Sequence, residues 1–301
     1  MNSRSVRSVL DTIGNTPLFR LGRMSSAEIF GKAEFLNPGG SIKDRVARHL
    51  IQQAEAEGVL RPGMTIVEAT SGNTGIGVAL VAAQRGYAAI IVMPENMSEE
   101  RKKIITALGA EVILTPASES LDGCLRVVSR LVAERGAEVW VPRQFSNPHN
   151  PGIHHATTGP EIWEAMEGRV DVFVAGVGSG GTLQGVGSYL KEMNPDVRVV
   201  AVEPRNASAL LGREPGLHQI QGIGDGFIPD VLDVHLVDMV ITVTDDQAIQ
   251  TTRLLAMREG LLVGTSSGAN VWAAMELASG SRRVVTVLPD RAERYFSTAL
   301  L

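Results

Sequence analysis

The sequence has a single cysteine, few aromatic residues and no long apolar run. Cys124 is the only cysteine among 301 residues, so neither an intrachain disulfide nor a zinc site built on several thiolates can form. No stretch approaches the roughly 18 apolar residues needed to span a bilayer. The first residues include Arg4 and Arg7 but no apolar segment follows them. We therefore predict a cytoplasmic protein that neither inserts into a membrane nor is secreted.

An excess of basic charge is also missing. Lys and Arg number 28 against 33 Asp and Glu, a net charge of −5, which argues against a general nucleic-acid binder because phosphate neutralisation needs clustered cations. Hydrophobic residues make up 44% and charged residues 20%, the composition of a globular chain long enough for two domains. Glycine, in contrast, is abundant at 32 residues, which indicates many tight loops where backbone approaches backbone or ligand.

Short β-branched runs alternate with helical patterns from about residue 28 to the end, which predicts an α/β fold with parallel sheets covered on both faces. An amphipathic helix is predicted over 44–57, and an apolar, buried one over 75–83. Two Asn-Pro pairs in Gln144–Pro151 mark the boundary between two α/β units. The predicted strands are 29–34, 65–69, 88–93, 112–114, 139–141, 170–175, 197–202, 261–263 and 284–288.

The loop Gly176–Thr182 (GVGSGGT) lies between an apolar strand and a helical segment. Consecutive backbone N–H groups at a helix N-terminus form an anion site, and Ser179 and Thr182 add hydroxyl donors. The loop alone therefore predicts phosphate binding, although a tight turn without a ligand would have the same composition.

The same loop also has the spacing of a dinucleotide site. Gly176, Gly178 and Gly181 form G-x-G-x-x-G, and Glu203 ends the next strand about 20 residues later. This pattern favours an alternative of a different class, an NAD-dependent oxidoreductase with a Rossmann fold.

Two further loops carry hydroxyl groups at predicted helix starts. Ala69–Gly75 (ATSGNTG) presents Thr70, Ser71, Asn73 and Thr74, which could hold a carboxylate or could only cap the helix. Gly264–Ala269 (GTSSGA) is predicted to follow a strand and open a helix, where Ser266 and Ser267 are by default caps.

The fourth loop, Asn37–Arg45 (NPGGSIKDR), runs into a helix whose first turn would contain Lys43 and Asp44. A helix N-terminus disfavours an ammonium group, so this position would help to lower the pKa of the Lys43 amine, as a Schiff-base lysine requires. A solvated lysine paired with Asp44 is the plainer alternative.

Together the four loops supply a carbonyl-reactive lysine, a phosphate site, a carboxylate site and a hydroxyl group at another helix start. Pyridoxal phosphate needs those parts, because its aldehyde condenses with lysine and its ring accepts electrons from a substrate carbanion. A nicotinamide cofactor explains only one loop. No metal is expected, since the six histidines form no i, i+4 pair, and Cys124 is predicted to be a small packing residue in a helix.

Long motifs follow one another along nearly the whole chain: IGNTPL (13–18), NPGGSIKDR (37–45), EATSGNTG (68–75), TTGPEIW (157–163), AGVGSGGT (175–182), AVEP (201–204), IQGIGDGFIP (220–229), GTSSGA (264–269) and ERYFSTAL (293–300). In these motifs the chain resembles the cysteine synthase (O-acetylserine sulfhydrylase) family, fold type II or β-family pyridoxal-phosphate enzymes. The resemblance implies two open, twisted, mostly parallel three-layer α/β domains. A smaller domain, 36–148, would move on substrate binding, and a larger one, 10–35 plus 149–301, would bind the phosphate.

The resemblance also implies roles for single residues. Lys43 would form the Schiff base with pyridoxal 5'-phosphate and then serve as base on the substrate α-carbon, Asn73 would bond the ring oxygen, and Ser266 would face the ring nitrogen. The phosphate would be held by Gly178, Ser179, Gly180, Gly181 and Thr182, with Ser179 where threonine is more usual. The substrate would be held by Thr70, Ser71, Gly72, Thr74, Gln144 and Gly222, with Gly222–Gly226 lining its side of the site.

The implied reaction is a β-replacement that makes L-cysteine from O-acetyl-L-serine and sulfide through an α-aminoacrylate. Gln221 stands where phosphoserine-using relatives can carry arginine, which favours O-acetylserine, whereas Arg143 and Arg205 leave O-phosphoserine open. The NPGGS motif also resembles cystathionine β-synthase, which adds homocysteine. Segments 120–124 and 290–292 depart from the usual family pattern. A homodimer that binds the C-terminal tail of a serine acetyltransferase is a further family expectation.

Overall fold

The structure is a computed structural model that describes residues 5–70, 72–280, 282–298 and 300. The chain divides into two compact units, each with its own sheet and core. The first unit consists of the residues up to Asn15 together with Asn37–Arg143. The second consists of Thr16–Leu36 together with the chain from Gln144 onward.

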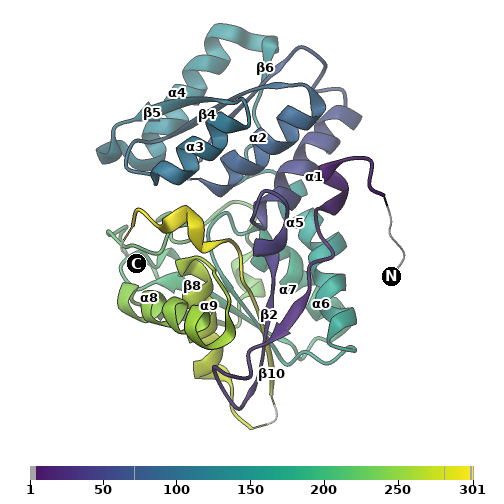
Figure 1. Ribbon diagram of the computed structural model, residues 1–301, viewed down its shortest axis with the longest axis vertical. Coiled ribbons are helices and arrows are strands. Elements are labelled where there is room, and N and C mark those ends of the chain that lie inside the picture. Colours follow the sequence, from purple (N-terminus) through teal and green to yellow (C-terminus); the bar gives the residue numbers. More distant parts are fainter. Residues whose placement is uncertain (1–4, 71, 281, 299, 301) are drawn as a thin grey trace. The chain divides into compact units, whose positions relative to one another are not determined.

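The first unit contains a four-stranded parallel sheet in the order β5-β4-β3-β6. Helix α4 lies on one face of this sheet, and α1, α2 and α3 lie on the other (Figure 1). The strands are β3 (Thr65–Ala69), β4 (Ala88–Pro94), β5 (Glu111–Thr115) and β6 (Val139–Trp140). The helices are α1 (Lys43–Ala56), α2 (Asn73–Arg85), α3 (Glu99–Ala107) and α4 (Ser120–Arg135).

The helices of the first unit bury the faces that their patterns predict. Helix α1 is amphipathic and buries Leu50 and Ile51, each at most 1% exposed. Helix α2 is apolar nearly all round, and Ile76, Val78 and Val81 are all fully buried in the core of this unit. Strong apolar periodicity decides these elements, because burial of apolar surface is the main favourable term in folding.

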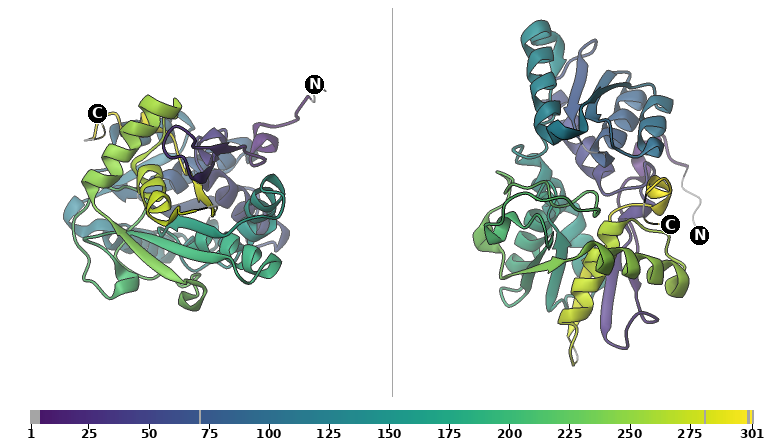
Figure 2. Two further views of the ribbon diagram at one scale, coloured as in Figure 1. Left: turned by 90° about the horizontal axis from the view of Figure 1, so that it is seen from below. Right: turned by 90° about the vertical axis from the view of Figure 1, so that its left-hand side faces the viewer.

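The second unit contains a six-stranded sheet in the order β1-β2-β10-β7-β8-β9, parallel except for the pairing of β1 with β2. Figures 1 and 2 show α8 and α9 on one face and α5, α6 and α7 on the other. The strands are β1 (Leu18–Arg20), β2 (Glu28–Lys32), β7 (Val172–Gly176), β8 (Arg198–Pro204), β9 (Met239–Val243) and β10 (Arg283–Val287). The helices are α5 (His149–Ile153), α6 (Gly159–Ala165), α7 (Gly181–Met193), α8 (Asp245–Leu254) and α9 (Thr265–Leu277).

Short helical turns complete both units. Two are π-helical, η5 (His154–Thr158) and η8 (Leu255–Glu259). The remainder are 3₁₀ turns at Val9–Thr12, Glu34–Leu36, Ala117–Glu119, Gly136–Glu138, Ala209–Leu211, Val234–Leu236 and Ala292–Tyr295. None of the described helices is both long and apolar enough to cross a membrane.

The predicted fold class, α/β with mostly parallel sheets and helices on both faces, is confirmed, but one predicted strand is absent and two strands, β1 and β9, were not predicted. Residues 261–263 form no strand, and Val263 makes only a single bridge to Arg291. Strand β9 was not predicted although its segment, MVITV, is rich in β-branched residues; it lies at the edge of the sheet, and Val243 is its only fully buried residue. The predicted strand 29–34 also ends early, at Lys32, and Glu34 begins a 3₁₀ turn.

Both sheets have a point where the chain reverses its direction of progress across the sheet. In the first unit the chain moves outward from β3 to β4 and β5 and then returns to the other side of β3 to form β6. In the second it moves from β7 to β8 and β9 and then returns to the other side of β7 to form β10. Ligands of open α/β sheets bind beyond the carboxyl ends of strands at such points. The loops that follow β3 and β7 therefore occupy the favoured ligand positions of their units.

Candidate functional site

Lys43 is the first residue of α1, as predicted, and its side chain is half-buried. The turn before it is fixed by Asn37, whose Oδ1 accepts a hydrogen bond of 2.8 Å from the Gly14 N–H, and by Asp44, whose Oδ2 accepts one of 2.6 Å from the Gly39 N–H. A Cβ on Gly39 would lie 2.5 Å from Asp44 Oδ1, so only glycine leaves room for this carboxylate. Asp44 is thus used to shape the turn.

The loop after β3 carries the residues predicted to bind a carboxylate. Thr70 is 3% exposed, and its Oγ1 accepts a hydrogen bond of 3.1 Å from the Gly72 N–H. Gly72 has φ +156° and ψ −80°, a conformation that side chains disfavour. Asn73 and Thr74 then begin α2, with no side chain capping its N-terminus in the described part of the loop. Ser71 lies outside the described residues.

Lys43 and the first turn of α2 belong to two helices that pack tightly against each other. A Cβ on Gly77 would lie 2.9 Å from the Lys43 carbonyl oxygen, so the backbones of α1 and α2 are almost in contact there. Asn73 precedes Gly77 by four residues and therefore lies on the same face of α2, one turn closer to its N-terminus. The first unit thus brings Lys43 and Asn73 to adjoining helix starts.

The loop between β7 and α7 is closely covered by backbone and side-chain atoms. A Cβ on Gly178 would lie 2.3 Å from the Gly222 carbonyl oxygen, and one on Gly181 would lie 2.0 Å from Asn150 Oδ1. Gly180 has φ +78° and is the N-cap residue of α7. These contacts require glycine at both positions and fix the backbone of the loop, whose N–H groups at the start of α7 are the donors that a phosphate would use.

Two residues that the sequence analysis did not single out hold the hydroxyl groups of this loop. The Asn150 amide Nδ2 donates hydrogen bonds of 3.1 Å to Ser179 Oγ and 2.8 Å to the Gln144 carbonyl oxygen. His154 is fully buried, with Nε2 at 3.4 Å from Thr182 Oγ1. The only sequence signal was their position in and just after the Asn-Pro segment, which was interpreted as a domain boundary.

Ser266 is 3% exposed and lies in the first turn of α9. The default interpretation of Ser266 and Ser267 as caps is wrong, because Gly264 is the N-cap residue and no side chain caps this helix. Asn270 lies four residues after Ser266, and its Nδ2 donates a hydrogen bond of 2.8 Å to the Val287 carbonyl oxygen. The Oδ1 of Asn270 would lie 3.2 Å from a Cβ on Gly176. The face of α9 that carries Ser266 therefore points toward the loop after β7.

Glycine is the N-cap residue of three α-helices in the described parts of the chain, α2, α7 and α9, which begin at three of the four predicted ligand loops. The fourth loop leads into α1, whose N-cap residue is Ile42. Glycine has no side chain that could satisfy the N–H groups of the first turn. Helix starts without a capping side chain fit a cofactor with a phosphate group and a substrate with a carboxylate.

The remaining predicted substrate residues both belong to the second unit. Gln144 is 3% exposed and its carbonyl oxygen accepts from Asn150. Gly222 is exposed and has φ +95°. Its carbonyl oxygen lies next to the α-carbon of Gly178, 2.3 Å from where a Cβ on that residue would be. Gly222 thus adjoins the predicted phosphate loop within its own unit. Gln144 is joined to the same loop through Asn150 and Ser179.

Glu203, the acidic residue of the dinucleotide pattern, is engaged within the protein. It is 2% exposed and accepts hydrogen bonds of 2.6 Å from Ser208 Oγ and 3.2 Å from the Leu210 N–H. Burial raises its pKa above the ordinary carboxyl value, although these hydrogen bonds oppose the shift. A carboxylate that binds a ribose must be accessible to it, so the environment of Glu203 argues against the nicotinamide alternative.

The raised pKa of Glu203 leads to a prediction about stability. Because the folded protein holds this proton more tightly than the unfolded chain, the stabilisation is complete below the unfolded pKa and is lost as pH rises through the folded pKa. Glu203→Gln keeps an acceptor for Ser208 and Leu210 but does not titrate. We expect the urea unfolding midpoint of Glu203→Gln to rise relative to that of the wild type as pH increases from about 4 to about 7. A difference that does not change with pH would contradict this prediction.

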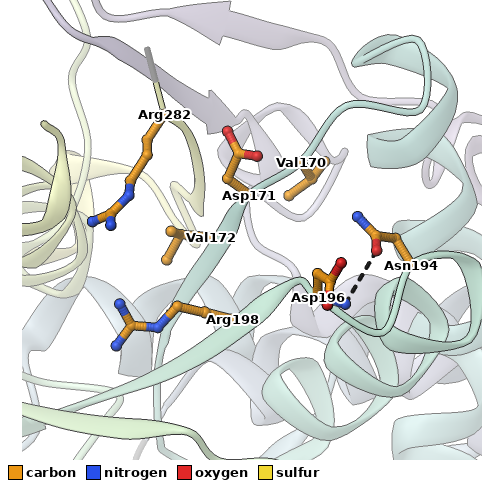
Figure 3. Close-up of a pocket in the computed structure, with 7 residues that line it drawn as sticks. All are labelled: Val170, Asp171, Val172, Asn194, Asp196, Arg198 and Arg282. Carbon is orange, nitrogen blue, oxygen red and sulfur yellow. Dashed lines mark hydrogen bonds between the residues drawn. The ribbon is translucent and has the colours of Figure 1, made fainter. Parts of the chain in front are cut away.

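A surface hollow of about 260 Å³ lies at the opposite, amino ends of β7 and β8 (Figure 3). The Asp171 carboxylate at its edge accepts a hydrogen bond of 2.7 Å from the Arg283 N–H. None of the predicted site residues lines this hollow, whose lining residues are Val170, Asp171, Val172, Asn194, Asp196, Arg198 and Arg282. It is therefore not the predicted cofactor site.

Cys124 is a fully buried residue of α4, as its helical pattern predicts. Its Sγ lies 3.2 Å from Thr115 Oγ1, and burial raises the pKa of the thiol. A thiol with a raised pKa and no exposure is a poor nucleophile, so Cys124 packs the first unit and takes no part in the candidate site.

Comparisons with known proteins agree with these features. A family model described as pyridoxal-phosphate dependent enzyme matches residues 9–290. Cysteine synthase A of Escherichia coli (strain K12) is 50% identical over 301 residues, which cover 96% of this chain and 93% of that protein. The structure of cysteine synthase from Entamoeba histolytica has a TM-score of 0.95 at 39% identity, covering 100% of this chain and 92% of that one. An O-acetylserine-dependent cystathionine β-synthase from Helicobacter pylori has a TM-score of 0.93 at 42% identity, covering 99% of both chains.

Proposed function

Because the chain belongs to the family of pyridoxal-phosphate-dependent enzymes, we propose that it makes L-cysteine from O-acetyl-L-serine and sulfide by β-replacement. The observation that carries this proposal is that a chain 50% identical to a cysteine synthase along nearly its whole length also contains all four ligand loops. Pyridoxal phosphate, when bound, supplies an aldehyde for a lysine and a ring that withdraws electrons from the substrate α-carbon.

The residues of the second unit would bind the cofactor. Backbone N–H groups of Gly178, Gly180 and Gly181 would donate to the phosphate oxygens, with hydroxyl groups of Ser179 and Thr182 beside them. The Ser266 hydroxyl would bond the ring nitrogen. A hydroxyl, unlike a carboxylate, does not stabilise a positive charge on that nitrogen, which suits elimination and replacement at the β-carbon.

The residues of the first unit would bind the amino acid and transfer its proton. Lys43 would hold the cofactor covalently and, once displaced by the substrate amine, would take the α-proton and later return it. Asn73 would donate to the ring oxygen. The α-carboxylate would be held by Thr70, Gly72 and Thr74 at the N-terminus of α2, by Gln144, and by Ser71, which lies outside the described residues.

We further propose that the smaller domain, 36–148, moves when the substrate binds and that Gly222–Gly226 then helps to exclude water from the reacting β-carbon. The larger domain, 10–35 plus 149–301, would carry the cofactor phosphate. The enzyme would act as a cytoplasmic homodimer, and its site would accept the C-terminal tail of a serine acetyltransferase.

The proposal is tested by following products with defined pairs of substrates. The protein loaded with pyridoxal phosphate is given O-acetylserine, O-phosphoserine or serine, each with sulfide or with homocysteine, and the products are quantified by mass spectrometry. We expect L-cysteine from O-acetylserine and sulfide, with kcat/KM at least about tenfold above every other pair. Cystathionine as the main product would assign the homocysteine reaction instead, and failure of all pairs would reject β-replacement.

A further inference from the structure

Arg101 is a buried cation beneath the loop that follows β3. It lies in the first turn of α3 and is 1% exposed, one of the largest fully buried side chains in the described chain. A Cβ on Gly72 would lie 2.4 Å from Arg101 Nε and 2.5 Å from its Cδ. The side chain of Arg101 therefore packs directly against the α-carbon of Gly72, in the space that any other residue at position 72 would fill.

The contact continues along one face of α3. Ile105 follows Arg101 by one turn and is fully buried, and its Cδ1 would lie 3.2 Å from a Cβ on Gly75. The loop between these contacts contains Gly72 at φ +156°, whose N–H donates to Thr70 Oγ1. Glycine adopts this conformation readily but has many others available, so contacts with neighbouring groups are what select it. Arg101 and Ile105 therefore pack against the turn that contains Gly72.

The position of Arg101 also matters for charge. The N-terminus of α2 carries a partial positive charge, and the Arg101 guanidinium lies against the residue that precedes this helix. A cation held away from water acts on its neighbours through a lower dielectric than a surface lysine does. Both charges favour an anion over the loop and disfavour a cation there.

We propose that Arg101 is a positioning residue for the substrate carboxylate. It holds the Gly72 turn in the conformation that presents the first N–H groups of α2, and it adds positive charge beneath them. This inference rests on the proposed function, in which the anion bound by the loop is the α-carboxylate of the amino acid. Sulfide has no carboxylate, so the binding of sulfide itself does not use the loop that Arg101 supports.

The test compares Arg101→Met, which removes the charge but keeps an unbranched side chain, with Arg101→Lys and with Lys103→Met. Lys103 is exposed on the same helix, so Lys103→Met removes one positive charge from α3 without touching the loop. The readouts are the dissociation constant of L-cysteine, from the visible absorption of the bound cofactor, and KM for each substrate. For Arg101→Met we expect at least about tenfold weaker L-cysteine binding and an equally raised KM for O-acetylserine, with KM for sulfide within about twofold of wild type.

Arg101→Lys should show an intermediate loss of affinity for L-cysteine, at least about threefold, because the ammonium keeps the charge but lacks the Nε that contacts Gly72. Lys103→Met should bind L-cysteine with the affinity of the wild type. Wild-type affinity in Arg101→Met, or in Arg101→Lys if the methionine variant does not fold, would overturn the inference. Equal rises in both KM values would also overturn it, because they would indicate general damage to the site. Wild-type protein that neither binds L-cysteine nor forms it would instead reject the proposed function.

Discussion

Lys43→Ala should abolish turnover and covalent attachment of the cofactor together. Lys43 is expected both to bond the cofactor aldehyde and to move the α-proton, so its loss removes the nucleophile and the base at once. We expect kcat/KM for cysteine formation to fall by at least about 1,000-fold. The measurement is initial-rate kinetics, together with borohydride reduction of the loaded protein and peptide mapping of the modified lysine.

The chain offers a sharp control for this experiment because it has only five lysines. Lys32 is the most buried alternative at 1% exposure, but its ammonium is 2.6 Å from Glu161 and donates to the Thr16 carbonyl oxygen. Lys102 and Lys191 are paired with Glu99 and Asp238. Lys32→Ala should lower stability yet retain a reducible cofactor on residue 43. Mapping of the reduced cofactor to any lysine other than Lys43 would contradict the assignment.

The sequence predicted the elements whose patterns are decided by burial. Strand β3 was predicted to the residue, and α1 and α2 were predicted within two residues at each end, because their apolar periodicity is strong. The glycine loops were also recognisable, since the close contact between Gly178 and the Gly222 carbonyl group leaves no alternative to glycine. Local chemistry of this kind is visible in a single sequence.

Features that depend on distant partners were not visible. Val263 is fully buried and β-branched, which suggested a strand, but it follows a π-turn and makes only one bridge. Strand β9 (MVITV) has the β-branched composition of a strand, and it pairs only with β8 at the sheet edge. Arg101 and Asn150 look like ordinary polar residues in the sequence. Their importance comes from contacts with Gly72 and Ser179, which no periodicity reveals.

Gly178→Ala should specifically damage cofactor binding. The added Cβ would lie 2.3 Å from the Gly222 carbonyl oxygen, a backbone atom that cannot rotate away, so the loop after β7 must shift. Overpacking against fixed atoms costs about 1–3 kcal/mol. If that shift displaces the N–H groups expected to hold the phosphate, affinity for pyridoxal phosphate should fall by about 10- to 100-fold. Titration of the apoprotein with the cofactor, followed by absorption, measures the effect.

Two other glycines separate this steric effect from a general effect of alanine. A Cβ on Gly152, within α5, meets no atom within 4 Å, so Gly152→Ala should bind the cofactor as wild type does and be as stable or slightly more stable. Gly181→Ala would meet Asn150 Oδ1 at 2.0 Å, but a side chain can move, so its loss of affinity should lie between the two. Cofactor binding by Gly178→Ala that matches Gly152→Ala would show that the loop after β7 does not hold the phosphate, whatever the activity of the enzyme.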